Sequence, residues 1–203
     1  NGESPFDHFV YVVGGEGCLE EGVTSEACSL AGTQHLGNLI FIYDDNRISI
    51  EDDTVIAFSE DVLMRYASYG WHTQHVDWTN GGSEYVEDVN ALYAAIEAAK
   101  TVTDRPSIIK LSTIMAWPSP TKQGTGAAHG AALGADEVAG LKKILGLDPE
   151  KSFDVADDVI AHTRKQAADN AAAARGEWDK QIAAWREANP KRSALLNRLV
   201  AKE

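Results

Sequence analysis

The chain has 203 residues, of which 44% are hydrophobic and 24% are charged, a balance typical of a globular protein with a packed core. It carries 18 Lys and Arg residues against 31 Asp and Glu residues. The resulting net charge of -13 argues against nucleic acid as a partner, because nucleic acids are bound mainly through basic side chains. Apolar runs such as Phe9–Val13 are far shorter than the roughly 20 residues that span a membrane, so we expect no membrane partner. The two cysteines, Cys18 and Cys28, are too few to cross-link a chain of this length and indicate a reduced, cytoplasmic protein.

Strand and helix patterns alternate along the first two thirds of the chain, which is typical of an α/β fold with a mostly parallel sheet. β-Branched and aromatic residues predict buried strands at 8–13 and 39–43, with a helix from about 19 to 34 between them. Strand–helix–strand connections are right-handed, so both strands end at the same edge of the sheet, where ligands of open α/β folds bind. Further helices are predicted at 60–69 and around 89–99, and further strands at 71–76 and 107–112.

The rest of the chain changes in character. Pro and Gly residues mark a long irregular stretch at about 116–134, and loops of that length are generally functional or mobile. A short helix is predicted from about 136 to 146. Further on, Trp178, Ile182 and Trp185 recur at helical spacing in an Ala-, Asp-, Lys- and Arg-rich segment. We therefore expect a sheet domain over residues 1–147 and a C-terminal helical arm over residues 148–203.

Candidate ligand-binding residues follow the first two strands. Gly15-Glu16-Gly17 comes after one strand and Asn46 after the next, so a carboxylate and an amide oxygen should face each other at the sheet edge. Backbone amides near Gly17 can hold an anion, and a hard divalent cation can bridge such oxygens to a diphosphate. A nicotinamide-binding turn is the main competitor, but it requires G-x-G-x-x-G, and Glu20 stands in place of the third glycine. On spacing alone, a Gly-Glu-Gly turn is as often purely structural.

Several motifs, in the same order along the chain, resemble those of transketolases. They are YVVGGEGCLEEG at 11–22, SEA at 25–27, LGNLI at 36–40, YDDNRISI at 43–50 and HGAALG at 129–134. The resemblance implies a thiamine-diphosphate-binding fold, truncated at its N-terminus, followed by a linker toward a pyrimidine-binding domain. It also implies a homodimeric enzyme of the pentose phosphate pathway that transfers a two-carbon ketol unit between sugar phosphates.

The same resemblance assigns residues to the cofactor, thiamine diphosphate, and to its divalent metal. Those implied to bind the cofactor are Gly15, Glu16, Gly17, Asn46, Ile48 and His129. The Glu16 carboxylate, the Asn46 amide oxygen and the Ile48 carbonyl would hold Mg²⁺ or Ca²⁺, and Gly17 would donate its N–H to the diphosphate. His129 would lie over the diphosphate and face the substrate channel as a catalytic residue. Glu16 replaces the aspartate usual in the family, which puts metal affinity in question.

Two further predictions depend on the resemblance. Glu21 and Glu26 match carboxylates near the dimer interface. Because transketolases are several times longer, we expect a fragment that supplies the diphosphate- and metal-anchoring half and has no turnover alone. Two alternatives stay open. One is another thiamine-diphosphate enzyme, such as a deoxyxylulose-phosphate synthase or a 2-oxoacid dehydrogenase component, and the other is a non-catalytic assembly or binding fragment.

Overall fold

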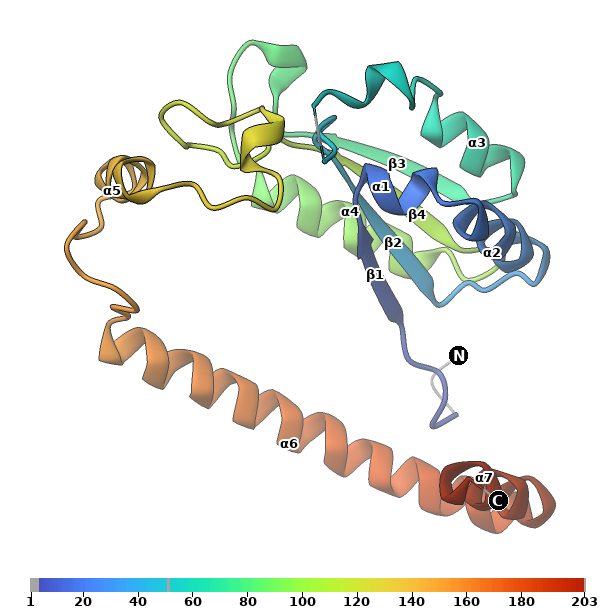
Figure 1. The fold of residues 1–203 in the computed structure, drawn as a ribbon. Helices are drawn as coiled ribbons and strands as arrows, with labels where there is room; N and C mark the ends of the chain where they lie inside the picture. The colour runs from blue at the N-terminus through green and yellow to red at the C-terminus, as the bar shows by residue number, and fades with distance from the viewer. Residues whose placement is uncertain (1–3, 51, 203) are drawn as a thin grey trace. The chain divides into compact units, whose positions relative to one another are not determined.

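The computed structural model describes residues 4–50 and 52–202 (Figure 1). The chain packs as two units, one formed by residues 9–150 and the other by residues 4–8 with 151–202. The boundary expected between residues 147 and 148 stays a prediction. Within the described residues, no helix is both long and apolar enough to cross a membrane.

A parallel four-stranded sheet forms the centre of the first unit. Its strands are β1 (Val10–Gly14), β2 (Leu39–Asp45), β3 (His72–Asp77) and β4 (Ser107–Ser112). Their order in the sheet is β1-β2-β4-β3, and every neighbouring pair is parallel. The predicted α/β fold is confirmed, and all four strands lie close to the predicted ranges.

Four helices connect the strands of this unit in the described residues, and a fifth follows β4. They are α1 (Glu16–Glu20), α2 (Gly22–Thr33), α3 (Val62–Ser68), α4 (Val89–Thr101) and α5 (Ala135–Ile144), with short 3₁₀ turns at Thr54–Ile56, Asn80–Gly82 and Gly126–Ala128. The single helix predicted from 19 to 34 is wrong at its start. Helical backbone begins at Glu16, so the expected Gly-rich turn is confined to Gly15, and extended backbone at Glu21 (φ -69°, ψ 129°) separates α1 from α2.

Alternate side chains of the strands build a core on each face of the sheet. On one face, Phe41 and Ile108 pack with residues of α1, α2 and α3, such as Leu19 and Tyr66. On the other face, Ile109 and its neighbours pack against α4 (Figure 1). Burial on both faces explains the near-continuous apolar runs of β2 and β4. The burial predicted for the first strand is not found in this chain: residues 10–13 of β1 are 40–72% exposed, since β1 lies at the edge of the sheet and these side chains belong to neither core.

α1 carries Glu16 and is anchored to the rest of the unit at its centre. Leu19 is 1% exposed, and its carbonyl accepts hydrogen bonds from the guanidinium group of Arg65 on α3 at 3.3 and 3.4 Å. The same guanidinium group donates to Ser25 Oγ on α2 at 3.0 Å. α3 therefore holds both segments of the broken helix and places the first turn of α1 at the sheet edge.

The second unit is helical, as predicted for the arm. It contains α6 (Asp157–Ala188) and α7 (Pro190–Ala201), and the proline occupies the first turn of α7, where its missing N–H costs nothing. The predicted stripe lies on one side of α6. Trp178 Nε1 donates to the Pro5 carbonyl at 2.9 Å, and Trp185 packs edge-on against Phe6 with ring centroids 5.0 Å apart.

Candidate functional site

The carboxyl ends of the parallel strands bring the predicted Glu16 and Asn46 segments together. Gly14 pairs with Tyr43, so the residues that follow β1 and β2 leave the sheet side by side. Glu16 Oε1 accepts a hydrogen bond from the Arg47 N–H at 2.5 Å. Asn46 Oδ1 accepts from the Ile48 N–H at 3.0 Å. The structure therefore joins the carboxylate to the turn that holds the amide oxygen.

The charge of Glu16 is unfavourable in this environment. Its side chain is almost fully buried, with the residue 2% exposed. Burial is the main cause that raises the pKa of the Glu16 carboxyl to about 7; the charges of Asp45 and Asp44 add to the rise, and the hydrogen bond from Arg47 opposes it. A buried carboxylate among other acids is a position where a cation would relieve repulsion.

The donor chemistry fits a hard divalent cation. In the described part of the chain, no three His, Cys, Asp or Glu side chains gather as a metal site. The expected ligand set is of another kind, because it combines the Glu16 carboxylate with the Asn46 amide oxygen and the Ile48 carbonyl. Such all-oxygen sets suit Mg²⁺ and Ca²⁺, and Mg²⁺ commonly completes its shell with phosphate oxygens and water.

A network of polar side chains supports Asn46 from the end of β2. Asp44 Oδ2 accepts from Asn46 Nδ2 at 2.8 Å, and Asp44 Oδ1 accepts from Thr113 Oγ1 at 2.5 Å. These bonds orient the Asn46 amide so that its oxygen points away from Asp44. Thr113 follows β4, so its contribution depends on the order of strands in the sheet.

The neighbouring Asp45 is buried and is held by an ion pair with the partly exposed Lys110. Its residue is 5% exposed, and Lys110 Nζ lies 3.0 Å from its Oδ2. Ser112 Oγ donates to the same oxygen at 2.8 Å, and the Tyr43 hydroxyl donates to Oδ1 at 3.3 Å. Sequence reasoning missed Lys110, although a lone lysine within the apolar strand Ser107–Ser112 is a signal of a buried charge partner.

The two predicted glycines border free space. A Cβ atom built on Gly17 would meet nothing within 4 Å, and one on Gly15 would approach only the Asp44 carbonyl, at 3.9 Å. Packing of the chain itself therefore does not require glycine at 17. Open space above the first turn of α1 leaves room for a ligand group to approach the backbone closely.

The other predicted site residues lie outside the hydrogen-bond network of Glu16 and Asn46. Glu21 and Glu26 are exposed, the first between α1 and α2 and the second on α2. His129 is half-buried after the 3₁₀ turn, where its N–H donates to the Gly126 carbonyl at 3.0 Å. Among the described residues, no hydrogen bond links its ring to Glu16 or Asn46.

Fold and site together define an open parallel α/β domain, and at the carboxyl ends of its strands oxygen donors lie beside Gly15 and the first turn of α1. A family model described as the thiamine diphosphate binding domain of transketolase matches residues 1–203. A transketolase of Mycobacterium tuberculosis is 52% identical over 202 residues, which are 100% of this chain and 28% of that protein. One from Nostoc is 45% identical over 195 residues, 96% of this chain and 28% of the relative.

Solved structures agree with the sequence relatives. A Pichia stipitis transketolase in complex with sedoheptulose 7-phosphate has a TM-score of 0.82 and 43% identity, and the match covers 95% of this chain and 27% of that one. The Leishmania mexicana transketolase also has a TM-score of 0.82, with 37% identity over 97% of this chain and 28% of that one. The chain belongs to the transketolase family, and it spans about 28% of the length of the curated relatives it matches. The transketolase prediction is thereby supported over other thiamine-diphosphate enzymes.

Proposed function

We propose that this chain is the diphosphate- and metal-anchoring part of a transketolase that transfers a two-carbon ketol unit between sugar phosphates in the pentose phosphate pathway. The observation that carries the proposal is the buried Glu16 carboxylate, which is bonded to the Arg47 N–H at 2.5 Å beside the open space above Gly17. Bound thiamine diphosphate supplies the electron sink for breaking and forming a carbon–carbon bond next to a ketone. The residues of this chain bind and orient the cofactor.

Each predicted residue has a part in this proposal. Glu16, Asn46 Oδ1 and the Ile48 carbonyl hold Mg²⁺ or Ca²⁺, while Gly15 and Gly17 line the diphosphate. The all-oxygen donor set and the acidic surroundings of Glu16 support a cation there. Glu16 is one methylene longer than the usual aspartate, so we expect Glu16→Asp to bind Mg²⁺ more tightly than the chain as it stands.

His129, Glu21 and Glu26 have proposed roles beyond the metal. His129 faces the substrate, and its position in a long loop between β4 and α5 supports a role at the entrance of the site. Glu21 and Glu26 lie at the subunit interface, and their exposure in this chain supports contact with another polypeptide.

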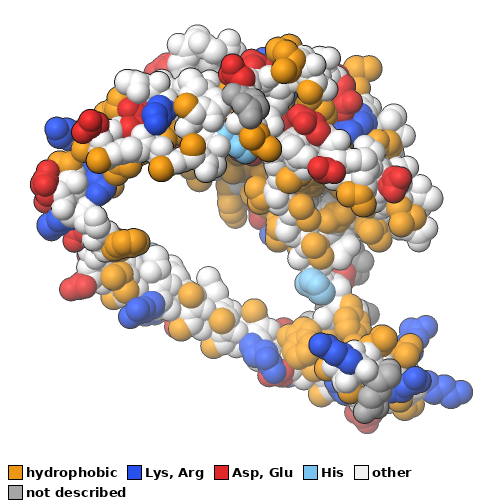
Figure 2. Space-filling model, in the orientation of Figure 1, with side chains coloured by type: hydrophobic (Ala, Val, Ile, Leu, Met, Phe, Trp, Pro, Cys, Tyr) orange, Lys and Arg blue, Asp and Glu red, His pale blue; other side chains and the backbone are white. Residues whose placement is uncertain are grey.

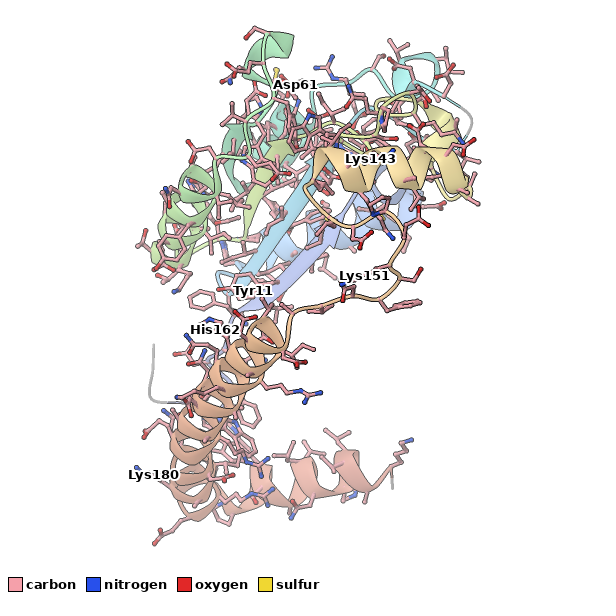
Figure 3. The ribbon with its side chains drawn as sticks, turned by 90° about the vertical axis from the view of Figure 1, so that its left-hand side faces the viewer. Tyr11, Asp61, Lys143, Lys151, His162 and Lys180 are labelled. Carbon is pink, nitrogen blue, oxygen red and sulfur yellow. The ribbon has the colours of Figure 1, made fainter. Side chains whose placement is uncertain are left out.

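The exposed edge of the sheet supports the proposal that further polypeptide packs against this chain. Val10, Tyr11, Val12 and Val13 of β1 are 40–72% exposed, although strands of parallel sheets are normally buried on both faces. Tyr11 is labelled in Figure 3, and Figure 2 shows hydrophobic side chains, in orange, at the surface of the same unit. An edge strand without charged or proline residues readily pairs with another strand. We propose that the remainder of the parent enzyme, or a second copy in a homodimer, covers this edge, and that the isolated chain has no ketol-transfer activity.

The cell compartment and the other partners follow the same proposal. Both thiols, Cys18 and Cys28, are free, which supports a reduced, cytoplasmic setting. Sugar phosphates are the substrates of the parent enzyme, and the net charge of -13 supports neither nucleic acid nor an anionic membrane as a partner.

Calorimetric titration of thiamine diphosphate into the purified chain tests the proposal. We expect binding with Mg²⁺ or Ca²⁺, none with EDTA, and at least tenfold weaker binding after Glu16→Ala or Asn46→Ala, because each substitution removes a metal ligand. Glu20→Ala is the matched control, since it removes an exposed carboxylate from the same helix. If the folded chain binds no cofactor under any condition, the proposal that it anchors the cofactor is wrong, and the alternative of an assembly or binding fragment takes its place.

A further inference from the structure

Several hydrogen bonds hold the irregular segment between β4 and α5 in place. Gly124 N donates to the Met115 carbonyl at 2.8 Å, and Thr125 Oγ1 donates to the Lys122 carbonyl at 2.8 Å. Lys122 Nζ in turn donates to the Leu133 carbonyl at 2.7 Å. This last bond holds residues 122 and 133 together and closes the loop that carries His129.

Glu137, in the first turn of α5, anchors the base of this loop. Its Oε1 accepts the N–H groups of Thr121 at 2.7 Å and of Lys122 at 3.0 Å, and also the hydroxyl of Ser119. Its Oε2 accepts Thr121 Oγ1 at 2.8 Å. Four donors from one short segment therefore converge on one carboxylate, and hydrogen bonds to a charged acceptor are the strong ones.

Three further observations concern the packing and the charge of this contact. Ser119 is 1% exposed, so its hydroxyl would lose its partner if the carboxylate were removed. α5, which carries the labelled Lys143 in Figure 3, also packs directly on the loop: a Cβ atom built on Gly140 would lie 2.8 Å from Pro120 Cγ. The hydrogen bonds from Ser119 and Thr121 hold the pKa of Glu137 at about 2, so it stays charged at neutral pH.

We propose that Glu137 is a positioning residue for His129: by clamping residues 119–122 to α5, it sets where the His129 loop stands relative to the Glu16–Asn46 edge. The inference rests on the proposed function, because His129 matters only if the edge holds the cofactor. Loss of the clamp detaches residues 119–122 from α5, although the Gly124 N–H still bonds the Met115 carbonyl. We then expect the backbone from 122 to 133, which carries His129, to sample more conformations.

The experiment uses the 203-residue chain with three substitutions. Glu137→Ala removes all acceptors, and Glu137→Gln keeps one oxygen that can still accept the Thr121 and Lys122 N–H groups. Asp136→Asn is the matched control, because it removes a charge from the same helical turn. Amide hydrogen exchange, the NMR signals of the His129 ring and the Kd for thiamine diphosphate with Mg²⁺ are measured for each.

In Glu137→Ala we expect exchange at the Thr121 and Lys122 amides to speed up by about 10- to 100-fold, the effect of losing a hydrogen bond to a charged group. Exchange in the β4 core should be unchanged, and the His129 ring signals should shift or broaden. Glu137→Gln should fall between Glu137→Ala and the parent chain, and Asp136→Asn should match the parent.

A double-mutant comparison separates positioning from general stabilisation. Glu137→Ala should weaken thiamine diphosphate binding by about the same factor as His129→Ala, and adding it to His129→Ala should have no further effect, because both act through one ring. If the parent chain binds no cofactor, the proposed function fails, and with it the role of His129 toward the cofactor. Unchanged exchange and unchanged His129 signals in Glu137→Ala overturn the positioning role itself, whether or not the cofactor binds.

Discussion

The ion pair between the buried Asp45 and the partly exposed Lys110 stabilises the strand end from which the site is built. Lys110→Met keeps the aliphatic stem of the side chain and removes the charge that lies 3.0 Å from Asp45 Oδ2. The Asp45 carboxylate then stays buried with only the Ser112 and Tyr43 hydroxyls as donors. Breaking a buried pair by removing one partner typically costs about 3–5 kcal/mol. Because the Lys110 side chain is 24% exposed and water screens it in part, we expect a loss of about 2–3 kcal/mol.

Urea unfolding of the chain at neutral pH measures this loss. The double variant Asp45→Asn with Lys110→Met has no unpaired buried charge, so we expect it to be more stable than Lys110→Met alone, with a net cost of about 1 kcal/mol or less. Lys100→Met is the control, because the pair between Lys100 and Glu97 is at the surface and should contribute under about 1 kcal/mol. A Lys110→Met variant as stable as Lys100→Met would refute the reasoning.

Two further predictions concern packing and pH. A Cβ atom on Gly32 would lie 1.9 Å from the Tyr69 carbonyl oxygen, so Gly32→Ala must displace backbone. We expect a loss of at least about 2 kcal/mol in thermal unfolding, against little or none for Gly22→Ala, where a Cβ meets nothing within 4 Å. The Glu137 pKa, lowered from 4.5 to about 2, makes its stabilisation fully present above about pH 4.5 and lost as the pH falls toward 2. The stability difference between the parent chain and Glu137→Gln should therefore shrink over that range in urea unfolding, and a difference that stays constant from pH 6 to 3 would contradict the assignment.

Local patterns in the sequence were sufficient for most of the fold. The strand at 107–112 and the helix on which Leu92 and Ile96 share a face follow from periodicity, because burial on one or both faces leaves a repeat in the sequence. The start of α1 was missed for a physical reason as well. Gly17 has a low helix propensity, yet the packed Leu19 and the buried Glu16 hold the first turn of α1 in helical geometry.

For the candidate site, too, the sequence determined some features and only the tertiary structure decided others. The amino-acid sequence alone determined which residue types follow the strands, Glu16 after the first and Asn46 after the second, and the order of motifs determined the family. Only the tertiary structure decided that the Glu16 carboxylate is buried against the Arg47 N–H, and that Glu137 clamps a segment well before it in the chain. Helical and strand periodicities arise from contacts between near neighbours, so they are visible in sequence. Pairings between distant polar side chains leave no repeat, because they depend on how the strands are ordered and on how the loops return to the sheet.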